Sequence, residues 1–281
     1  MTLEIPKREL GKTGVEVTIL GLGGEGVLRT RGYDREAYDL INRALDLGIT
    51  YCESARAYDG SESYYGKALR ERRSEVFLTS KSHARSKAGA LTHLHETLGN
   101  MRTDHLDLWQ VHDVRTGDEI EEIFAPGGAI EAFVEARGKG LVRFIGVTGH
   151  HDPAVIRACM KRFPFDTVLL PVNPAEPAQR SFIGEVIPLA LERKMGVIGM
   201  KVYFRGLATR IPGHTGMEPY LRYALSQPVS TVVIGCDDLR QLEENVRFAS
   251  SFQPMTNEEQ ESLVRHVLPL ARQLMYYKPG M

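Results

Sequence analysis

The sequence predicts an α/β protein in which eight parallel strands form a (β/α)8 barrel. Short apolar runs alternate with segments of helical spacing, and this pattern repeats eight times. The apolar runs are continuous, which is typical of parallel strands that are covered on both faces. The 281 residues, 42% of them hydrophobic, suffice for one large core, and no linker or low-complexity segment divides them. We therefore expect residues 1–281 to form a single domain.

The first unit begins with a short hairpin. Its turn is expected at residues 11–14, and a buried strand over residues 17–22 follows and ends in the glycine cluster GLGG. Gly24 belongs to this cluster, where the lack of a side chain lets a ligand approach the backbone. Asp34 is the expected N-cap of the next helix, and Gly48 is its expected stop.

The remaining units follow in regular order. Seven further strands are expected at residues 50–53, 76–81, 106–112, 142–148, 167–171, 197–201 and 231–235. The helices that follow them are expected at residues 62–72, 87–101, 129–138, 153–163, 182–194, 217–227 and 239–249. An additional amphipathic helix over residues 257–277 is expected to pack on the outside of the barrel.

A doubly wound open sheet is the alternative arrangement of such units. The segment GLGGEG comes close to the GxGxxG fingerprint of that fold, but the fingerprint runs directly into a helix. Here the segment VLRTRGYD separates the glycines from the next helix. The closed barrel is therefore the favoured prediction.

The composition indicates a small-molecule partner. The formal net charge is −1, with 35 basic and 36 acidic residues, so no strong field would attract nucleic acid or an anionic membrane. Cys52, Cys159 and Cys236 lack CxxC spacing, which argues against a disulfide framework and against an iron–sulfur cluster. No apolar run approaches the roughly 20 residues that cross a bilayer. We expect a cytoplasmic protein, and the sequence does not indicate its oligomeric state.

Four side chains that can donate or accept a proton stand at or just after the ends of three successive expected strands. Glu53 and Lys81 end the second and third strands, His112 ends the fourth, and Tyr58 stands in the loop behind Glu53. The carboxyl ends of barrel strands form the face that carries active sites. The sequence therefore predicts that these four residues form a catalytic site.

Their chemistry suits carbonyl reduction. A phenol with a pKa near 10 is a poor proton donor at neutral pH unless a cation lies beside it. Lys81 would supply that cation and lower the pKa of Tyr58, and Glu53 would keep the lysine charged. His112 would orient the carbonyl oxygen.

Several segments together resemble the aldo-keto reductase family in their order and spacing. They are RELGKTGVEVTILGLGG, GITYCESARAYDGSESYYGKAL, LTSK, DLWQVH, GKGLVRFIGVTGH and VVIGCDDLRQLEENV. The resemblance implies a (β/α)8 barrel that reduces an aldehyde or ketone, or oxidises an alcohol, with a nicotinamide cofactor and no metal. It assigns the family's tyrosine, lysine and histidine to Tyr58, Lys81 and His112. Glu53 stands where the family has an aspartate, which keeps the charge and adds a methylene.

The resemblance also implies where the cofactor binds. Thr148 and Gly149 replace the Ser-Asn pair that holds the carboxamide, Asn173 is a compensating partner, and Met200 replaces the tyrosine that stacks on the nicotinamide. The full predicted set of cofactor-binding residues is Gly24, Thr148, Gly149, Asn173, Met200, Lys201, Arg205, Gly206, Gly235, Arg240, Gln241, Glu244 and Asn245. Lys201 and Arg205 would face the pyrophosphate.

NADPH is the usual cofactor of the family, and this chain weakens that expectation. The basic residue, hydroxyl and arginine that hold the 2′-phosphate are replaced by Gly235, Cys236 and Gln241. Arg240 lies beside the expected place, and Glu244 with Asn245 matches the pair that contacts adenine. NADPH is therefore expected, with NADH as a possible cofactor.

Two other functions remain open from the sequence. One is a sensor or accessory subunit that binds the dinucleotide with little turnover, because Glu53 and the carboxamide positions depart from the family pattern. The other is a metal-dependent barrel hydrolase, which the absence of an HxH motif disfavours. His150 and His151 are adjacent at a strand–loop junction, where neighbouring side chains are expected to point in opposite directions. No metal site is therefore predicted.

Overall fold

Eight parallel strands form a closed barrel in the computed structural model, which describes residues 4–278. The strand order around the barrel is β10-β3-β4-β5-β6-β7-β8-β9. The strands are β3 (Leu20–Gly26), β4 (Tyr51–Glu53), β5 (Phe77–Ser82), β6 (Leu106–Val111), β7 (Val142–Thr148), β8 (Thr167–Pro171), β9 (Gly196–Met200) and β10 (Thr231–Cys236). The predicted (β/α)8 barrel is confirmed, and the open sheet is excluded because β10 pairs with β3.

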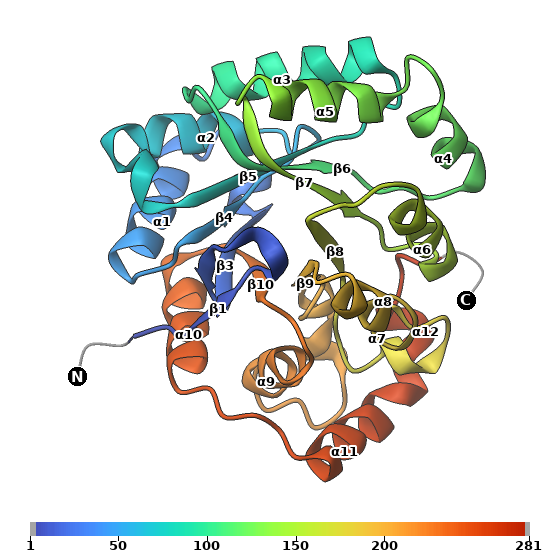
Figure 1. The fold of residues 1–281 in the computed structure, drawn as a ribbon. Coiled ribbons are helices and arrows are strands. Elements are labelled where there is room, and N and C mark those ends of the chain that lie inside the picture. Colours follow the sequence, from blue (N-terminus) through green and yellow to red (C-terminus); the bar gives the residue numbers. More distant parts are fainter. Residues whose placement is uncertain (1–3, 279–281) are drawn as a thin grey trace.

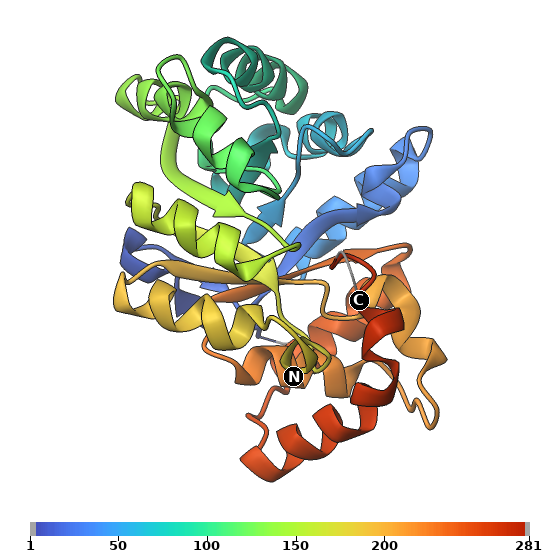
Figure 2. The ribbon, with the colours of Figure 1, turned by 90° about the vertical axis from the view of Figure 1, so that its right-hand side faces the viewer.

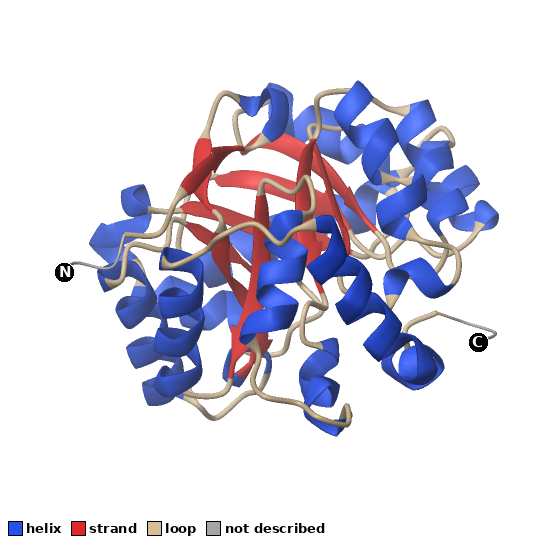
Figure 3. Cartoon of the chain, turned by 90° about the horizontal axis from the view of Figure 1, so that it is seen from below, coloured by secondary structure: helices blue, strands red, loops and turns tan. Residues whose placement is uncertain are grey.

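Helices surround the strands on all sides (Figure 1, Figure 3). They are α1 (Asp34–Asp46), α2 (Ser61–Ala68), α3 (Lys87–Met101), α4 (Gly117–Phe124), α5 (Ala129–Gly138), α6 (Pro153–Arg162), α7 (Phe182–Glu185), α8 (Ile187–Glu192), α9 (Glu218–Ser226), α10 (Leu239–Ser250), α11 (Asn257–Val267) and α12 (Ala271–Leu274). Six short 3-10 helices are η1 (Gly11–Thr13), η2 (Val27–Arg29), η3 (Arg70–Glu75), η4 (Glu176–Ala178), η5 (Phe204–Arg210) and η6 (Leu268–Leu270). No helix within residues 4–278 is both long enough and apolar enough to span a membrane.

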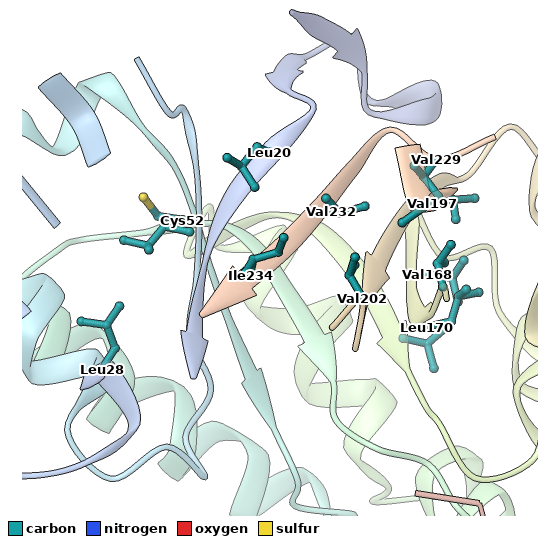
Figure 4. Close-up of a cluster of buried hydrophobic side chains, with 14 of the residues drawn as sticks. Leu20, Leu28, Cys52, Val168, Leu170, Val197, Val202, Val229, Val232 and Ile234 are labelled. Carbon is teal, nitrogen blue, oxygen red and sulfur yellow. The ribbon is translucent and has the colours of Figure 1, made fainter. Parts of the chain in front are cut away.

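Two apolar layers hold the barrel together. Outward-facing strand side chains such as Val168, Val197 and Val232 pack in the layer between strands and helices (Figure 4). A second cluster fills the barrel interior, where Tyr51 and Phe77 stack with their ring centroids 5.6 Å apart. These layers explain the continuous apolar runs, because each strand buries both of its faces.

The predicted N-terminal hairpin closes one end of the barrel. It consists of β1 (Lys7–Glu9) and β2 (Glu16–Thr18), which pair antiparallel. Leu10 and Val17 are fully buried in the interior cluster, beside residues at the start of β4 and β5. The amino-terminal mouth is thereby filled by side chains, and the carboxyl end of the strands is the end that holds a cavity.

Some predicted boundaries are wrong. Val17 belongs to the hairpin rather than to the first barrel strand, and that strand continues through the glycines as far as Gly26. Asp34 is the first helical residue rather than the N-cap, and it forms an ion pair with Lys67. The helix predicted over residues 182–194 is divided into α7 and α8, since Pro188 near the start of α8 has no N–H for a continuous helix.

The C-terminal segment differs most from its prediction. Figure 2 shows its helices, drawn in red, gathered at one side of the molecule. The predicted continuous outer helix is instead α11, η6 and α12, and the chain then turns inward. The hydroxyl of Tyr277 donates to Glu176 Oε1 at 2.7 Å, and Lys278 Nζ lies 2.8 Å from Glu176 Oε2. These buried polar contacts fix the last described residues against the loop after β8.

Candidate active site

A cavity of about 1120 Å³ opens at the carboxyl end of the barrel strands. Its floor is formed by residues at or near the strand ends, namely Gly23, Glu53, Lys81, His112, Thr148, Leu169, Met200 and Ile234. Both polar and apolar side chains line it, and it is large enough for a small substrate together with a cofactor. The predicted catalytic residues Tyr58, Lys81, His112 and Glu53 all line this one cavity.

Lys81 lies at the bottom of the cavity and is 1% exposed. It forms an ion pair with Glu53 and donates a hydrogen bond of 2.8 Å to the carbonyl oxygen of Ser54. The other carboxylate oxygen of Glu53 accepts from the backbone N–H of Gly24 at 3.1 Å. The longer acid therefore still reaches the lysine. Each charge in this buried pair has further hydrogen-bond partners, as a buried charge requires.

Tyr58 lies above this pair, on the loop between β4 and α2. The Nζ atom of Lys81 is 4.9 Å from the centroid of the phenol ring, and the ring of His112 meets it edge-on at 6.1 Å. No side chain within residues 4–278 forms a hydrogen bond with the Tyr58 hydroxyl. That hydroxyl is thus available to a ligand, and the ammonium lies against the ring.

Gly24 makes room for the tyrosine. A Cβ atom at this position would lie 2.7 Å from Cδ2 of Tyr58 and 2.9 Å from the carbonyl oxygen of Glu53. Both approaches are too close for any residue except glycine. The prediction placed Gly24 against the cofactor, and the structure places it beneath the Tyr58 ring, outside the residues that line the cavity.

The pKa of Tyr58 is raised, whereas the sequence predicted that Lys81 would lower it. Burial raises the pKa of Tyr58, Glu25 adds to this effect, and Arg29 opposes it. Glu53 neutralises Lys81, so the pair carries little net charge with which to lower the phenol's pKa. Burial also lowers the pKa of Lys81.

His112 is held as a neutral imidazole. Burial lowers its pKa, and the nearby charge of Lys81 lowers it further. Its Nδ1 atom is buried and has no hydrogen-bond partner among residues 4–278. A neutral imidazole can donate a hydrogen bond to a carbonyl oxygen from one ring nitrogen.

Most of the predicted cofactor-binding residues line the same cavity. They are Thr148, Met200, Lys201, Arg205, Gly206, Gly235, Arg240, Gln241, Glu244 and Asn245. Gly149 and Asn173 do not line it. Gly149 packs against α6, where a Cβ atom would lie 2.3 Å from Ile156 Cδ1. Asn173 is fully buried and donates to the Tyr277 hydroxyl at 2.9 Å, so its amide is used within the protein.

The loop after β9 contributes the cationic side of the cavity. Lys201, Phe204 and Arg205 all have left-handed backbone angles, with φ of 57°, 52° and 54°. Such angles are uncommon for residues other than glycine and occur at functional sites. Burial lowers the pKa of Lys201 to about 8. No carboxylate of the described chain forms an ion pair with this lysine, which leaves it available to an anionic ligand.

Several cavity residues were not predicted from the sequence. Tyr276 and Tyr277 come from the C-terminal segment, and the ammonium of Lys201 lies 5.6 Å and 5.3 Å from their ring centroids. Glu25 and Arg29 face the cavity as an ion pair of 2.6 Å near the end of β3. No pattern in the sequence connects these segments, because the contacts join residues that are far apart in the chain.

The prediction that His150 and His151 point in opposite directions is wrong. Their ring centroids are 4.6 Å apart, and both Nε2 atoms approach Oδ1 of Asp113, at 3.4 Å and 3.7 Å. Burial lowers the pKa of His150 to about 2 and also lowers that of His151. The strand–loop junction bends at this point, so the alternation of side chains along an extended strand no longer holds.

Comparison with known proteins identifies the family to which this barrel belongs. A model of the aldo/keto reductase family matches residues 19–214. The chain belongs to the aldo/keto reductase family. It is therefore an NAD(P)-dependent oxidoreductase, and the prediction from the sequence motifs is confirmed.

Several members of the family are similar over most of their length. The uncharacterized oxidoreductase YqkF of Bacillus subtilis (strain 168) is 25% identical, over 92% of this chain and 96% of that protein. The aldo-keto reductase YhdN of the same organism is 30% identical, over 71% of this chain and 62% of its own. The holo form of aldo-keto reductase AKR11C1 from Bacillus halodurans has the same fold, with a TM-score of 0.78, 24% identity and coverage of 94% and 96%.

Proposed function

We propose that the protein reduces an aldehyde or ketone to an alcohol, or catalyses the reverse oxidation, with Tyr58 as the general acid and base. A reduced nicotinamide, once bound in the cavity, would supply the hydride for the carbonyl carbon. Tyr58 gives its proton to the carbonyl oxygen as negative charge develops there, and His112 orients that oxygen. Lys81, which is paired with Glu53, lies with its ammonium 4.9 Å from the centroid of the phenol ring.

One observation supports this proposal above the others. Glu53 and Tyr58 at and after the end of β4, Lys81 in β5 and His112 after β6 all line the same cavity. The raised pKa of Tyr58 keeps the proton on the phenol at neutral pH. That protonated form is the one that donates in the reductive direction.

The cavity residues fit a dinucleotide. Lys201 and Arg205 offer positive charge for a pyrophosphate on a backbone that is held in left-handed angles. Thr148 accepts the N–H of Asp113 at 2.8 Å, and its hydroxyl hydrogen is free to donate to a carboxamide oxygen. Met200 lines the floor, where its thioether can cover one face of the nicotinamide ring.

The choice between NADPH and NADH depends on the loop after β10. Arg240 lines this part of the cavity, as do Asp237 and Glu244. We propose NADPH as the preferred cofactor, with a small preference because those acids oppose a 2′-phosphate. The Arg240→Ala variant is expected to raise the KM for NADPH by about tenfold, as loss of one charged hydrogen bond implies, and to leave the KM for NADH unchanged. An equal change for both cofactors would show that Arg240 does not contact the 2′-phosphate.

The proposed reaction is tested by the absorbance of the reduced nicotinamide in the presence of a panel of aldehydes and ketones. The Tyr58→Phe variant keeps the ring and loses the proton, so kcat is expected to fall by about 10²- to 10⁴-fold. Cofactor affinity, measured by fluorescence, is expected to stay the same. Tyr38→Phe is the matched control, because Tyr38 is an exposed tyrosine on α1.

Two results would contradict the proposal. Turnover that persists in Tyr58→Phe would assign the proton to another group. Tight binding of the cofactor, with no oxidation of it by any carbonyl compound in the wild-type protein, would favour a dinucleotide sensor.

A further inference from the structure

The geometry points to a binding site for a divalent transition-metal ion, formed by Asp113, His150 and His151 in the wall of the cavity. This site is separate from the proposed hydride and proton transfer and is not needed for it. The three side chains come from two neighbouring strand ends, since Asp113 follows β6 and the histidines follow β7. One ligand atom from each lies within 4.8 Å of the other two.

The distances fit metal coordination better than hydrogen bonding. Asp113 Oδ1 lies 3.4 Å from Nε2 of His150 and 3.7 Å from Nε2 of His151. In a tetrahedral site with metal–ligand bonds of about 2.0–2.2 Å, neighbouring ligand atoms lie roughly 3.4 Å apart. Small side-chain rotations would therefore place all three atoms around one ion.

Two of the three ligand atoms lack a hydrogen-bond partner in the described chain. Asp113 Oδ1 and His151 Nε2 are both buried and form no hydrogen bond. Buried polar atoms without a hydrogen-bond partner are rare and costly, and an ion that binds between two of them would satisfy both. Here the two atoms face each other across a common space, which is where an ion would lie.

The surrounding residues hold Asp113 in the orientation that this site requires. Arg115 contacts its other oxygen, Oδ2, through Nε at 2.8 Å and a terminal nitrogen at 2.6 Å. Arg85 binds the carbonyl oxygen of Asp113 at 2.9 Å, and Thr148 accepts its N–H. The backbone φ of Asp113 is +51°, a left-handed angle that costs free energy and that these contacts maintain. A ligating carboxylate is commonly fixed in this way by hydrogen bonds to its other oxygen.

The donor set indicates the class of ion. Two imidazoles and one carboxylate suit Zn²⁺, Co²⁺, Ni²⁺ or Cu²⁺, whereas Mg²⁺ and Ca²⁺ prefer oxygen ligands alone. All three residues line the cavity that a substrate would enter. A site with three protein ligands and one open position binds water or an oxygen atom of a small molecule there.

The site is tested with Zn²⁺ and Co²⁺ on full-length protein that carries no histidine tag and has been treated with a chelator. Calorimetric titration of the wild-type protein with Zn²⁺ is expected to show one ion bound per chain. Co²⁺ is expected to give the visible absorption of a site with nitrogen and oxygen ligands, and Zn²⁺ is expected to displace it. His151→Asn and Asp113→Asn are each expected to weaken Zn²⁺ binding by at least about tenfold.

A second histidine pair provides the matched control. The rings of His83 and His93 also lie 4.6 Å apart, but this pair belongs to no three-ligand group within residues 4–278. His93→Asn is therefore expected to leave Zn²⁺ affinity unchanged. Thermal unfolding in the presence of chelator checks that each variant is folded, and added Zn²⁺ should raise the Tm of the wild type and of His93→Asn only.

Three outcomes would overturn the proposal. They are no binding of Zn²⁺ or Co²⁺ by the wild-type protein, unchanged affinity in both His151→Asn and Asp113→Asn, and loss of binding in His93→Asn. Thermal unfolding shows independently which variants are folded. A loss of Zn²⁺ affinity in a folded His151→Asn protein therefore identifies His151 as a metal ligand. Failure of this experiment would leave the proposed carbonyl reduction unaffected, since Tyr58→Phe tests that reaction without metal.

Discussion

The two halves of the cavity are built in different ways. On the side of β4, β5 and β6, Glu53, Lys81 and His112 stand at or next to strand ends, and the lysine and the acid form a closed buried pair. On the side of β8, β9 and β10, the wall consists of a loop with left-handed backbone angles and a C-terminal segment held by Glu176. The first half is positioned by the barrel itself, and the second by contacts between distant segments. We therefore expect the first half to tolerate few substitutions, whereas the second half should adjust its structure to them.

The largest expected effect is in the first half. Lys81→Met leaves the Glu53 carboxylate buried without its cation, so the free energy of unfolding is expected to fall by about 3–5 kcal/mol in urea denaturation. The double variant Lys81→Met with Glu53→Gln removes both charges and is expected to recover most of that loss, while turnover stays absent. A loss of less than about 1 kcal/mol in the single variant would show that the ion pair does not contribute to stability as a buried pair should.

A smaller effect is expected from the support of the second half. Glu176→Gln removes the charge that holds Tyr277 and Lys278. Lys278 keeps its hydrogen bonds to the carbonyl oxygens of Gln179 and Arg180. Stability is expected to fall by about 3 kcal/mol, the lower end of the cost of breaking a buried ion pair, because Lys278 keeps two other hydrogen-bond partners. The KM for the cofactor or substrate should rise while kcat changes little, because the wall moves and the floor does not. Glu192→Gln is the control, because Glu192 is an exposed acid at the end of α8. If kcat of the Glu176→Gln variant fell by as large a factor as KM rises, the two halves of the cavity would not be independent.

The smallest effect is a pH dependence of cofactor binding. Burial lowers the pKa of Lys201 to about 8, so the lysine is charged below that pH and neutral above it. Affinity for the anionic cofactor is therefore expected to decline several-fold as the pH rises through about 8. In the Lys201→Arg variant the charge persists, and the decline should disappear. Fluorescence titration at a series of pH values measures both, and an identical decline in the variant would assign the effect to another group.

The sequence predicted the first half of the cavity well for a physical reason. Strand ends are recognisable as the last residues of apolar runs, and parallel strands bring those ends to one face. The sequence alone therefore predicts that Tyr58, Lys81 and His112 lie close together. Gly24 shows the limit of this reasoning. The pattern predicts that a ligand approaches the backbone there, but it does not predict that the Tyr58 ring covers this position.

The second half was harder to predict because its contacts are not local. Tyr277 reaches Glu176 across 101 positions of the chain, and no periodicity reports such a contact. The position of the histidine pair after β7 was also mispredicted, since the rule of alternating side chains applies only while the backbone remains extended. Left-handed angles at Asp113 and Lys201 are set by surrounding hydrogen bonds and packing rather than by the preference of the residues themselves.

The hairpin that fills the amino-terminal mouth has a kinetic consequence. Because Leu10 and Val17 fill that end in the described part of the chain, both reactants are expected to enter and leave at the carboxyl end of the strands. A bulky inhibitor bound at this opening would exclude the coenzyme and the carbonyl compound together. The product would also have to leave before another substrate molecule could bind.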